Sequence, residues 1–241
     1  MTDAVPQAIL EARQERAESA RLDNFVDGAF AFAITLLVIS GASLPQNVAA
    51  LEHALRGVPA FAACFAQLAW FWYAHVRWRD SVRLTDSTSL LLSLLLVFFA
   101  LIFVFPLHLV FGALFYGISS GELSAGSYST AAGFGLHDTA ALFVCYGLSF
   151  ACMAGTLCAL YVHGVRAAGR RTREESMRLR VKAATWGFVA MIGVLSMLMA
   201  IFLPTRAGWV VGVPGFSYFL LSLTGPVAHH YRKHLEATLP P

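Results

Sequence analysis

Six stretches of the chain are apolar over the length that a helix needs to cross a lipid bilayer. The hydrocarbon core of a membrane is about 30 Å thick, and about 20 apolar residues in helical form span it. The stretches run from about Asn24 to Leu44, Leu55 to Trp78, Ser87 to Ile118, Asp138 to Gly164, Ala183 to Leu203 and Trp209 to His229. The third is long enough to tilt or to carry an interfacial turn after Pro106. The pattern predicts an all-α, polytopic membrane protein with six transmembrane helices.

The balance of residue types supports a lipid environment. Hydrophobic residues make up 58% of the 241 residues and charged residues only 13%, whereas about 25% of a soluble domain is charged. The net charge of +3 does not indicate a nucleic-acid partner, because the basic residues lie between the apolar stretches and form no patch with interleaved aromatics. We therefore expect a multi-pass protein of the cell membrane, with the lipid bilayer as a partner and no nucleic acid.

Lysine and arginine are distributed unevenly over the segments that connect these stretches. All except Arg56 and Arg206 lie in the N-terminal tail, the second and fourth connections and the C-terminal tail. Basic residues accumulate on the cytoplasmic side of membrane proteins, so six spans place both termini in the cytoplasm. We expect a cytoplasmic N-terminal segment (1–23), a six-helix transmembrane domain (24–229) and a cytoplasmic C-terminal tail (230–241).

Few ionisable residues fall inside the apolar stretches. Asp27 lies about one turn into the first, and His75 lies near the end of the second, with Arg77 just beyond it. A charge within a membrane is costly without a partner, so we expect Asp27 to pair with His75 or Arg77 at the same depth. The pair is interpreted as a structural clamp between helices, and direct handling of an ion or proton by Asp27 remains an alternative.

Common catalytic motifs do not occur in the sequence. It has no GxSxG or HExxH motif, no Gly-rich phosphate loop and no paired carboxylates within the apolar stretches. The four cysteines lie in apolar stretches without CxxC spacing, so neither a disulfide framework nor a zinc site is expected. We therefore predict that the protein is not an enzyme and holds no cofactor or metal.

Three blocks of sequence carry a more specific signal. The block RLDNFVDGAFAFAITLLVISGASLP opens with Arg21 and continues with Phe25 and Asp27. The block WFWYAHVRWRDSVRLTD contains Trp72, His75 and Arg77, and LLLSLLLVFFALIFVFPLHLVFG contains Pro106. These blocks resemble the first three helices of the transmembrane-protein-175 (TMEM175) family of potassium channels, of the prokaryotic type with one repeat of six helices. The motif network that the resemblance implies consists of Arg21, Phe25, Asp27, His75 and Arg77.

The resemblance also implies a function and a site. It implies a potassium-selective, or cation-selective, leak-type channel that assembles as a homotetramer, with the first helix lining the pore and potassium ions as the permeant. The implied hydrophobic constriction consists of Phe32, Thr35, Leu36 and Ile39. Positions 32, 36 and 39 share one helix face, with Thr35 beside them. The chain departs from the family pattern at Val26, where the family has Ser, and at Phe32, where it usually has Ile.

Two other functions remain open at this level. One is a proton- or ion-coupled membrane carrier that uses Asp27 and His75. The other is a non-conducting membrane scaffold that has kept the fold and lost the pore, for which Phe32 is the motivating residue. The three functions differ in ion flux: ohmic for a channel, saturable and gradient-coupled for a carrier, and absent for a scaffold.

Overall fold

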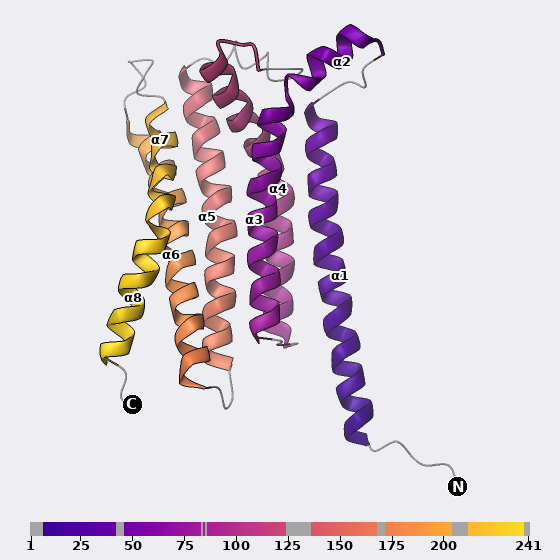
Figure 1. Cartoon of the computed structure of the whole chain (residues 1–241), viewed down its shortest axis with the longest axis vertical. Helices are drawn as coiled ribbons and strands as arrows, with labels where there is room; N and C mark the ends of the chain where they lie inside the picture. The colour runs from indigo at the N-terminus through magenta and orange to yellow at the C-terminus, as the bar shows by residue number, and fades with distance from the viewer. Residues whose placement is uncertain are drawn as a thin grey trace.

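The computed structural model describes residues 7–41, 46–82, 84, 86–123, 136–167, 172–203 and 212–238, and these residues are helical with short turns. The elements are α1 (Gln7–Gly41), α2 (Val48–Leu55), α3 (Val58–Val82), α4 (Ser87–Ser119), α5 (Leu136–Ala167), α6 (Arg173–Phe202), α7 (Val213–Phe216), the 3-10 helix η3 (Ser217–Leu223) and α8 (Thr224–Thr238), as Figure 1 shows. The predicted all-α class is confirmed for the part of the chain that the structure describes.

Several helices have the length and apolar composition of membrane spans. Among the described residues, four single helices meet this criterion. The spans are Ser19–Ile39 in α1, Ser87–Ser119 in α4, Asp138–Ala167 in α5 and Arg173–Phe202 in α6. The pair α2 and α3, which is bent by 48° between its members, counts as a fifth if the two are taken together. These elements coincide with the first five predicted stretches. The sixth corresponds to the successive short elements α7, η3 and α8, and its beginning at Trp209 lies outside the described residues.

Helix boundaries differ from the predicted stretches where polar residues extend a helix. The first helix begins at Gln7, so the predicted boundary between 1–23 and 24–229 falls inside one continuous helix. Helix α6 begins ten residues before the predicted Ala183, at Arg173. The Thr172 side chain accepts a hydrogen bond from the Glu175 backbone N–H, and the Glu175 side chain accepts one from Thr172 N–H. This capping box stabilises a polar first turn that hydropathy alone does not detect.

Of the two alternatives for the third stretch, a tilted helix or an interfacial turn after Pro106, the structure does not have the turn. Pro106 lies inside α4, which continues to Ser119. The helix ends where Ser120 (φ 54°) and Gly121 (φ 96°) adopt left-handed conformations and the Gly121 N–H bonds to Tyr116 O. Glycine adopts this conformation without steric cost, which makes it a common helix terminator.

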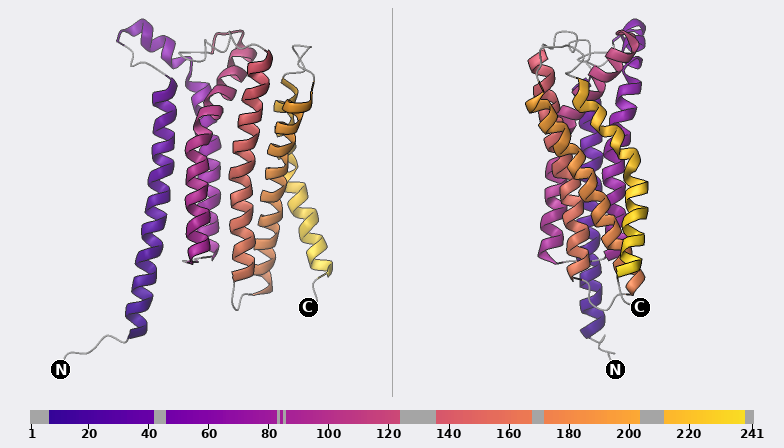
Figure 2. Two further views of the ribbon diagram at one scale, coloured as in Figure 1. Left: turned by 180° about the vertical axis from the view of Figure 1, so that it is seen from behind. Right: turned by 90° about the vertical axis from the view of Figure 1, so that its left-hand side faces the viewer.

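The helices form an elongated bundle with α1 at one edge and α6, α7 and α8 at the other (Figures 1 and 2). The start of α1, the end of α3, the start of α6 and the end of α8 lie at one end of the bundle, and α2 lies at the opposite end. The interior between α3, α4 and α5 contains the aromatic side chains Phe71, Phe103 and Phe150, whose ring centroids lie 5.4–6.3 Å apart. Helix α1 packs on this interior through α3 and α4.

Helices α5 and α6 approach each other closely at Gly147 and Gly193. A Cβ atom added at Gly193 would lie 2.9 Å from both Gly147 O and Ala151 N. Small residues allow this kind of close helix contact in membranes, where van der Waals packing provides much of the association energy. The glycine pair therefore holds α5 and α6 together as a closely packed unit.

Candidate functional site

Helix α1 is the element in which the predicted site residues concentrate, and over the side chains described between residues 17 and 39 one face is packed within the chain. Val26, Phe30, Ala33 and Leu37 are at most 2% exposed and lie in the hydrophobic core. Their spacing of four, three and four residues places them along one side of the helix. This side contacts α3 and α4.

The opposite side of α1 carries most of the predicted constriction residues. Phe32 is 57% and Ile39 is 67% exposed, and Thr35 between them is also exposed. Leu36 is half-buried and packs partly against the core, so it lies at the edge of this surface. We call Phe32, Thr35 and Ile39 the outward face of α1. An apolar face of this kind, in a helix that crosses a membrane, meets either lipid or another protein chain.

The hydroxyl of Thr35 is positioned by its own helix. Thr35 Oγ1 donates a 2.9 Å hydrogen bond to Ala31 O. A threonine hydroxyl has one donor hydrogen and two acceptor lone pairs. Because the hydrogen is used within the helix, the lone pairs remain for a donor or a cation on the outward face.

The structure corrects the predicted pairing of Asp27. Asp27 Oδ1 accepts a 2.7 Å hydrogen bond from Trp72 Nε1, and not from His75 or Arg77. His75 is 2% exposed and instead lies 3.0 Å from Ser93 Oγ of α4. Arg77 is exposed, with its guanidinium 5.9 Å from the Tyr73 ring centroid. Trp72 lies one turn before His75 on α3, and its long side chain reaches α1 while the imidazole turns inward.

A second polar contact between α1 and α3 lies one turn from the first. Arg79, 6% exposed, donates from Nε to Asp23 Oδ1 at 2.6 Å and from Nη2 to Ser19 Oγ at 2.5 Å. Its Nη1 donates to Leu84 O, which follows α3, at 2.5 Å. Sequence reasoning missed this cluster. The signal was the spacing of Ser19, Asp23 and Asp27 at every fourth residue, which places all three on one side of the helix.

The five residues of the predicted motif network do not form one connected group within a single chain. Arg21 and Phe25 are exposed on α1, with Phe25 56% exposed. Asp27 and His75 bond to different partners, and Arg77 faces another part of the molecule. The described contacts thus join α1 to α3 through Asp27–Trp72 and Asp23–Arg79.

A third polar contact lies at the same end of the bundle, at the start of α4. Asp86 caps this helix by accepting from Thr88 N and Ser89 Oγ, and its Oδ2 lies at hydrogen-bond distance, 2.8 Å, from His163 Nε2 of α5. Burial acts to raise the pKa of the Asp86 carboxyl, but the hydrogen bonds and charge from Ser89 and His163 outweigh it and lower this pKa below its usual value. The α3–α4 connection is thereby joined to α5.

The described residues contain no group of three or more His, Cys, Asp or Glu side chains placed to hold a metal ion.

Comparison with known protein families gives a match to the part of the chain that contains the second half of α1, α2, α3 and α4 as far as Pro106. Residues 21–106 match the family described as endosomal/lysosomal potassium channel TMEM175. The predicted resemblance to the TMEM175 family is confirmed. A protein of Marivirga tractuosa described as a potassium channel is 40% identical over 58 residues, which is 24% of this chain and 23% of that protein. The alignment thus spans about a quarter of the curated relative.

The fold resembles a solved TMEM175 structure over nearly its whole length. A crystal structure of a variant of the potassium channel MtTMEM175, in complex with a nanobody–MBP fusion protein, matches with a TM-score of 0.75. The match covers 90% of this chain and 94% of that chain at 23% sequence identity. The second half of this chain, which the family model does not match, therefore shares the fold of the TMEM175 protein.

Proposed function

We propose that the chain is one subunit of a passive, leak-type potassium or cation channel in the cell membrane, assembled as a homotetramer. Potassium is the permeant ion, no cofactor takes part, and the protein is not an enzyme. The description of the Marivirga tractuosa relative as a potassium channel, and the TMEM175 match over residues 21–106, support this proposal.

The observation that carries the proposal is the outward face of α1. Phe32, Thr35 and Ile39 lie on a helix at the edge of the bundle, opposite the side that packs on the chain's own core. Four copies of α1 around an axis would place these residues at the centre and the cores of the subunits outside. Leu36, at the edge of the face, would contact both the axis and its own core.

Conduction through such an axis would be controlled by an apolar constriction. Four Phe32 rings would narrow the path and exclude water, and a hydrated cation would lose ligands as it passes. Thr35 oxygens, one helical turn further along, would supply lone pairs to the partly dehydrated ion. The two positions together give a barrier and a site without any charged ring.

We further propose six membrane crossings with both termini in the cytoplasm. The run of α7, η3 and α8 extends from Val213 to Thr238 alongside α6 in Figure 1. At about 1.5 Å for each residue it is long enough to cross a core of about 30 Å. With α2 and α3 as one bent span, the total is six. The basic residues of the described elements lie at the end that holds both termini, except Arg56 at the end of α2.

Potassium flux from liposomes that contain the purified protein tests the proposal. We expect flux driven by a potassium gradient alone, with a current proportional to voltage and no need for a proton gradient. Saturable flux that requires a proton gradient would instead identify a carrier. Complete absence of flux from correctly assembled protein would identify a non-conducting scaffold.

A further inference from the structure

A pocket of about 400 Å³ lies between α3, α5, α6 and α8, at the end of the bundle where α3 ends and α6 begins. No described residue of α1 lines it, so the pocket takes no surface from the helix that would face a central axis. Its walls combine basic residues, carboxylates and the apolar side chains Leu179 and Val181. The pocket takes no part in the proposed ion path.

Most of the charged groups around this pocket are already engaged. Arg178 forms an ion pair with Glu174, and Arg232 forms one with Glu236 at 2.9 Å. Glu175 accepts a hydrogen bond from the backbone as part of the capping box of α6. The two ion pairs offset the charges of Arg178 and Arg232, and the capping box holds the Glu175 carboxylate at the start of α6.

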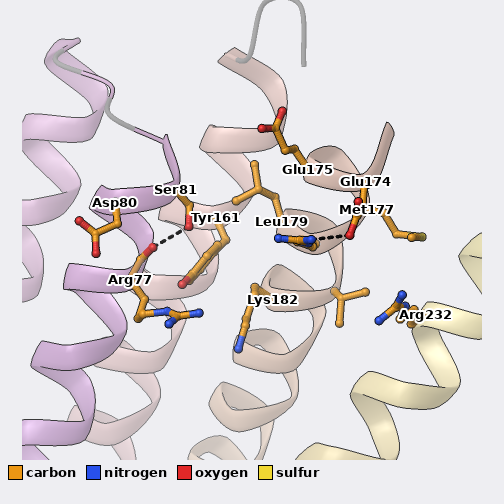
Figure 3. A pocket seen from close by; sticks show the side chains of 12 residues that line it. Arg77, Asp80, Ser81, Tyr161, Glu174, Glu175, Met177, Leu179, Lys182 and Arg232 are labelled. Atoms are coloured by element: carbon orange, nitrogen blue, oxygen red, sulfur yellow. Dashed lines mark hydrogen bonds and ion pairs between the residues drawn. The ribbon is translucent and has the colours of Figure 1, made fainter. Parts of the chain in front are cut away.

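Two basic side chains differ from this pattern. Arg77 of α3 and Lys182 of α6 line the pocket, and among the described residues no ion pair joins either to a carboxylate. Figure 3 shows both side chains reaching toward the space beside Tyr161, while the Asp80 carboxylate points to the other side of α3. Tyr161 is 3% exposed and its hydroxyl lies 3.4 Å from Ala74 O. Two cations therefore converge on one space with no anion between them.

The chemistry of this space fits a phosphate group. A guanidinium donates two parallel hydrogen bonds to phosphate oxygens, and an ammonium adds a compact positive charge. Arg77 and Lys182 also lie at the boundary of apolar helix segments, next to Trp78 and Ala183 respectively, which is the depth of lipid headgroups. The apolar wall of Leu179 and Val181 suits the glycerol and upper acyl part of a lipid.

We infer that the pocket binds the phosphate of an anionic phospholipid through Arg77 and Lys182. The site is a lipid contact of the cytoplasmic end of α3 and α6, and bound lipid bridges these helices. It does not depend on the pore proposal, since no residue described in α1 lines the pocket.

Native mass spectrometry of the full-length protein in detergent tests the inference. We expect the wild-type protein to retain phosphatidylglycerol in preference to phosphatidylcholine. Arg77→Gln and Lys182→Gln should each lower the affinity for phosphatidylglycerol about fivefold, the factor that corresponds to about 1 kcal/mol for a basic residue near an anionic membrane surface. Lys182→Arg, which keeps the charge, should retain the lipid.

Two controls test whether lipid retention depends on this pocket and on a lipid occupant. Lys233→Gln removes a basic residue at the same end but outside the pocket, and it should leave lipid retention unchanged. Inorganic phosphate at millimolar concentration should not displace phosphatidylglycerol from the wild-type protein. Unchanged retention in Arg77→Gln and Lys182→Gln, or equal loss in Lys233→Gln, overturns the assigned pocket. Displacement by inorganic phosphate overturns the lipid as its occupant and identifies a site for free phosphate.

Discussion

The indole of Trp72 donates a 2.7 Å hydrogen bond to the carboxylate of Asp27, and so joins α3 to α1. The contact lies one turn along α1 from the Arg79–Asp23 ion pair. Together the two contacts set the rotation of α1 about its axis. They therefore determine which residues form its packed side and which form its outward face.

Trp72→Phe removes the donor and keeps most of the aromatic volume. Asp27 then loses a charge-assisted hydrogen bond, which contributes about 1–2 kcal/mol to stability at a partly exposed site. We expect a lower melting temperature in detergent for this variant. Asp27→Asn, which retains an oxygen acceptor for the indole N–H, should lower the melting temperature less. A Trp72→Phe protein as stable as the wild type would show that the bond does not hold α1.

Asp27 is also predicted to matter more for assembly than for conduction. Asp27→Ala should reduce the amount of tetramer recovered in mild detergent, because α1 is no longer held in the orientation that presents its outward face. Size-exclusion chromatography with light scattering measures this amount. Normal assembly combined with loss of ion flux would instead mean that Asp27 acts on ions.

Arg79 should be less tolerant of substitution than Arg77. Arg79 is buried and donates to Asp23, Ser19 and Leu84 O. The Asp23 side chain is 40% exposed and can be hydrated when its partner is removed. We therefore expect Arg79→Ala to lower the free energy of unfolding by about 2 kcal/mol, less than the 3–5 kcal/mol lost when one partner of a fully buried pair is removed. Arg79→Lys should recover only part of this, because an ammonium cannot reproduce the planar arrangement of donors. The matched control is Arg77→Ala, which should leave thermal stability unchanged when both variants are measured on delipidated protein; equal losses in the two variants contradict this assignment.

The sequence predicted the helices and their order well because long apolar stretches have few alternatives in a membrane. It also predicted that Asp27 needs a partner, since an intramembrane carboxylate is costly. It did not predict Trp72 as that partner, because depth along two helices does not specify how each helix is rotated. The inward turn of His75 toward Ser93 and the contact of Arg79 with Asp23 depend on the same rotation. Similarly, the polar first turn of α6 depends on the Thr172–Glu175 capping box and not on hydropathy.

The contact between Gly147 and Gly193 predicts a marked sensitivity to added volume. A Cβ at Gly193 would lie 2.9 Å from backbone atoms of α5, so Gly193→Ala must separate α5 and α6. We expect Gly193→Ala to lower the free energy of unfolding by about 1–3 kcal/mol, the usual effect of overpacking a well-packed contact. Gly155→Ala serves as the control, since no atom lies within 4 Å of its added Cβ. Thermal unfolding in detergent measures both, and equal stability of the two variants would contradict the close approach.

The proposed topology predicts which ends of the bundle are accessible from outside the cell. In a background with the four native cysteines replaced, a cysteine at Ser120 should react with a membrane-impermeant thiol reagent applied to intact cells. A cysteine at Ala237, near the end of α8, should react only after the membrane is permeabilised. Labelling of Ala237→Cys in intact cells would contradict six spans with cytoplasmic termini.

The central claim is that the outward face of α1 lines an ion path, and potassium flux through Phe32→Ala in liposomes tests it most directly. Removal of four rings would widen and wet the constriction. We therefore predict higher potassium flux for each tetramer and weaker discrimination between potassium and sodium. Leu36→Ala should have the same effect more weakly. Val38→Ala, whose side chain is also exposed but points about 120° away from that of Phe32, should have neither effect. Unchanged or reduced flux in Phe32→Ala, with assembly intact, would contradict the claim and place Phe32 against lipid or in a helix interface.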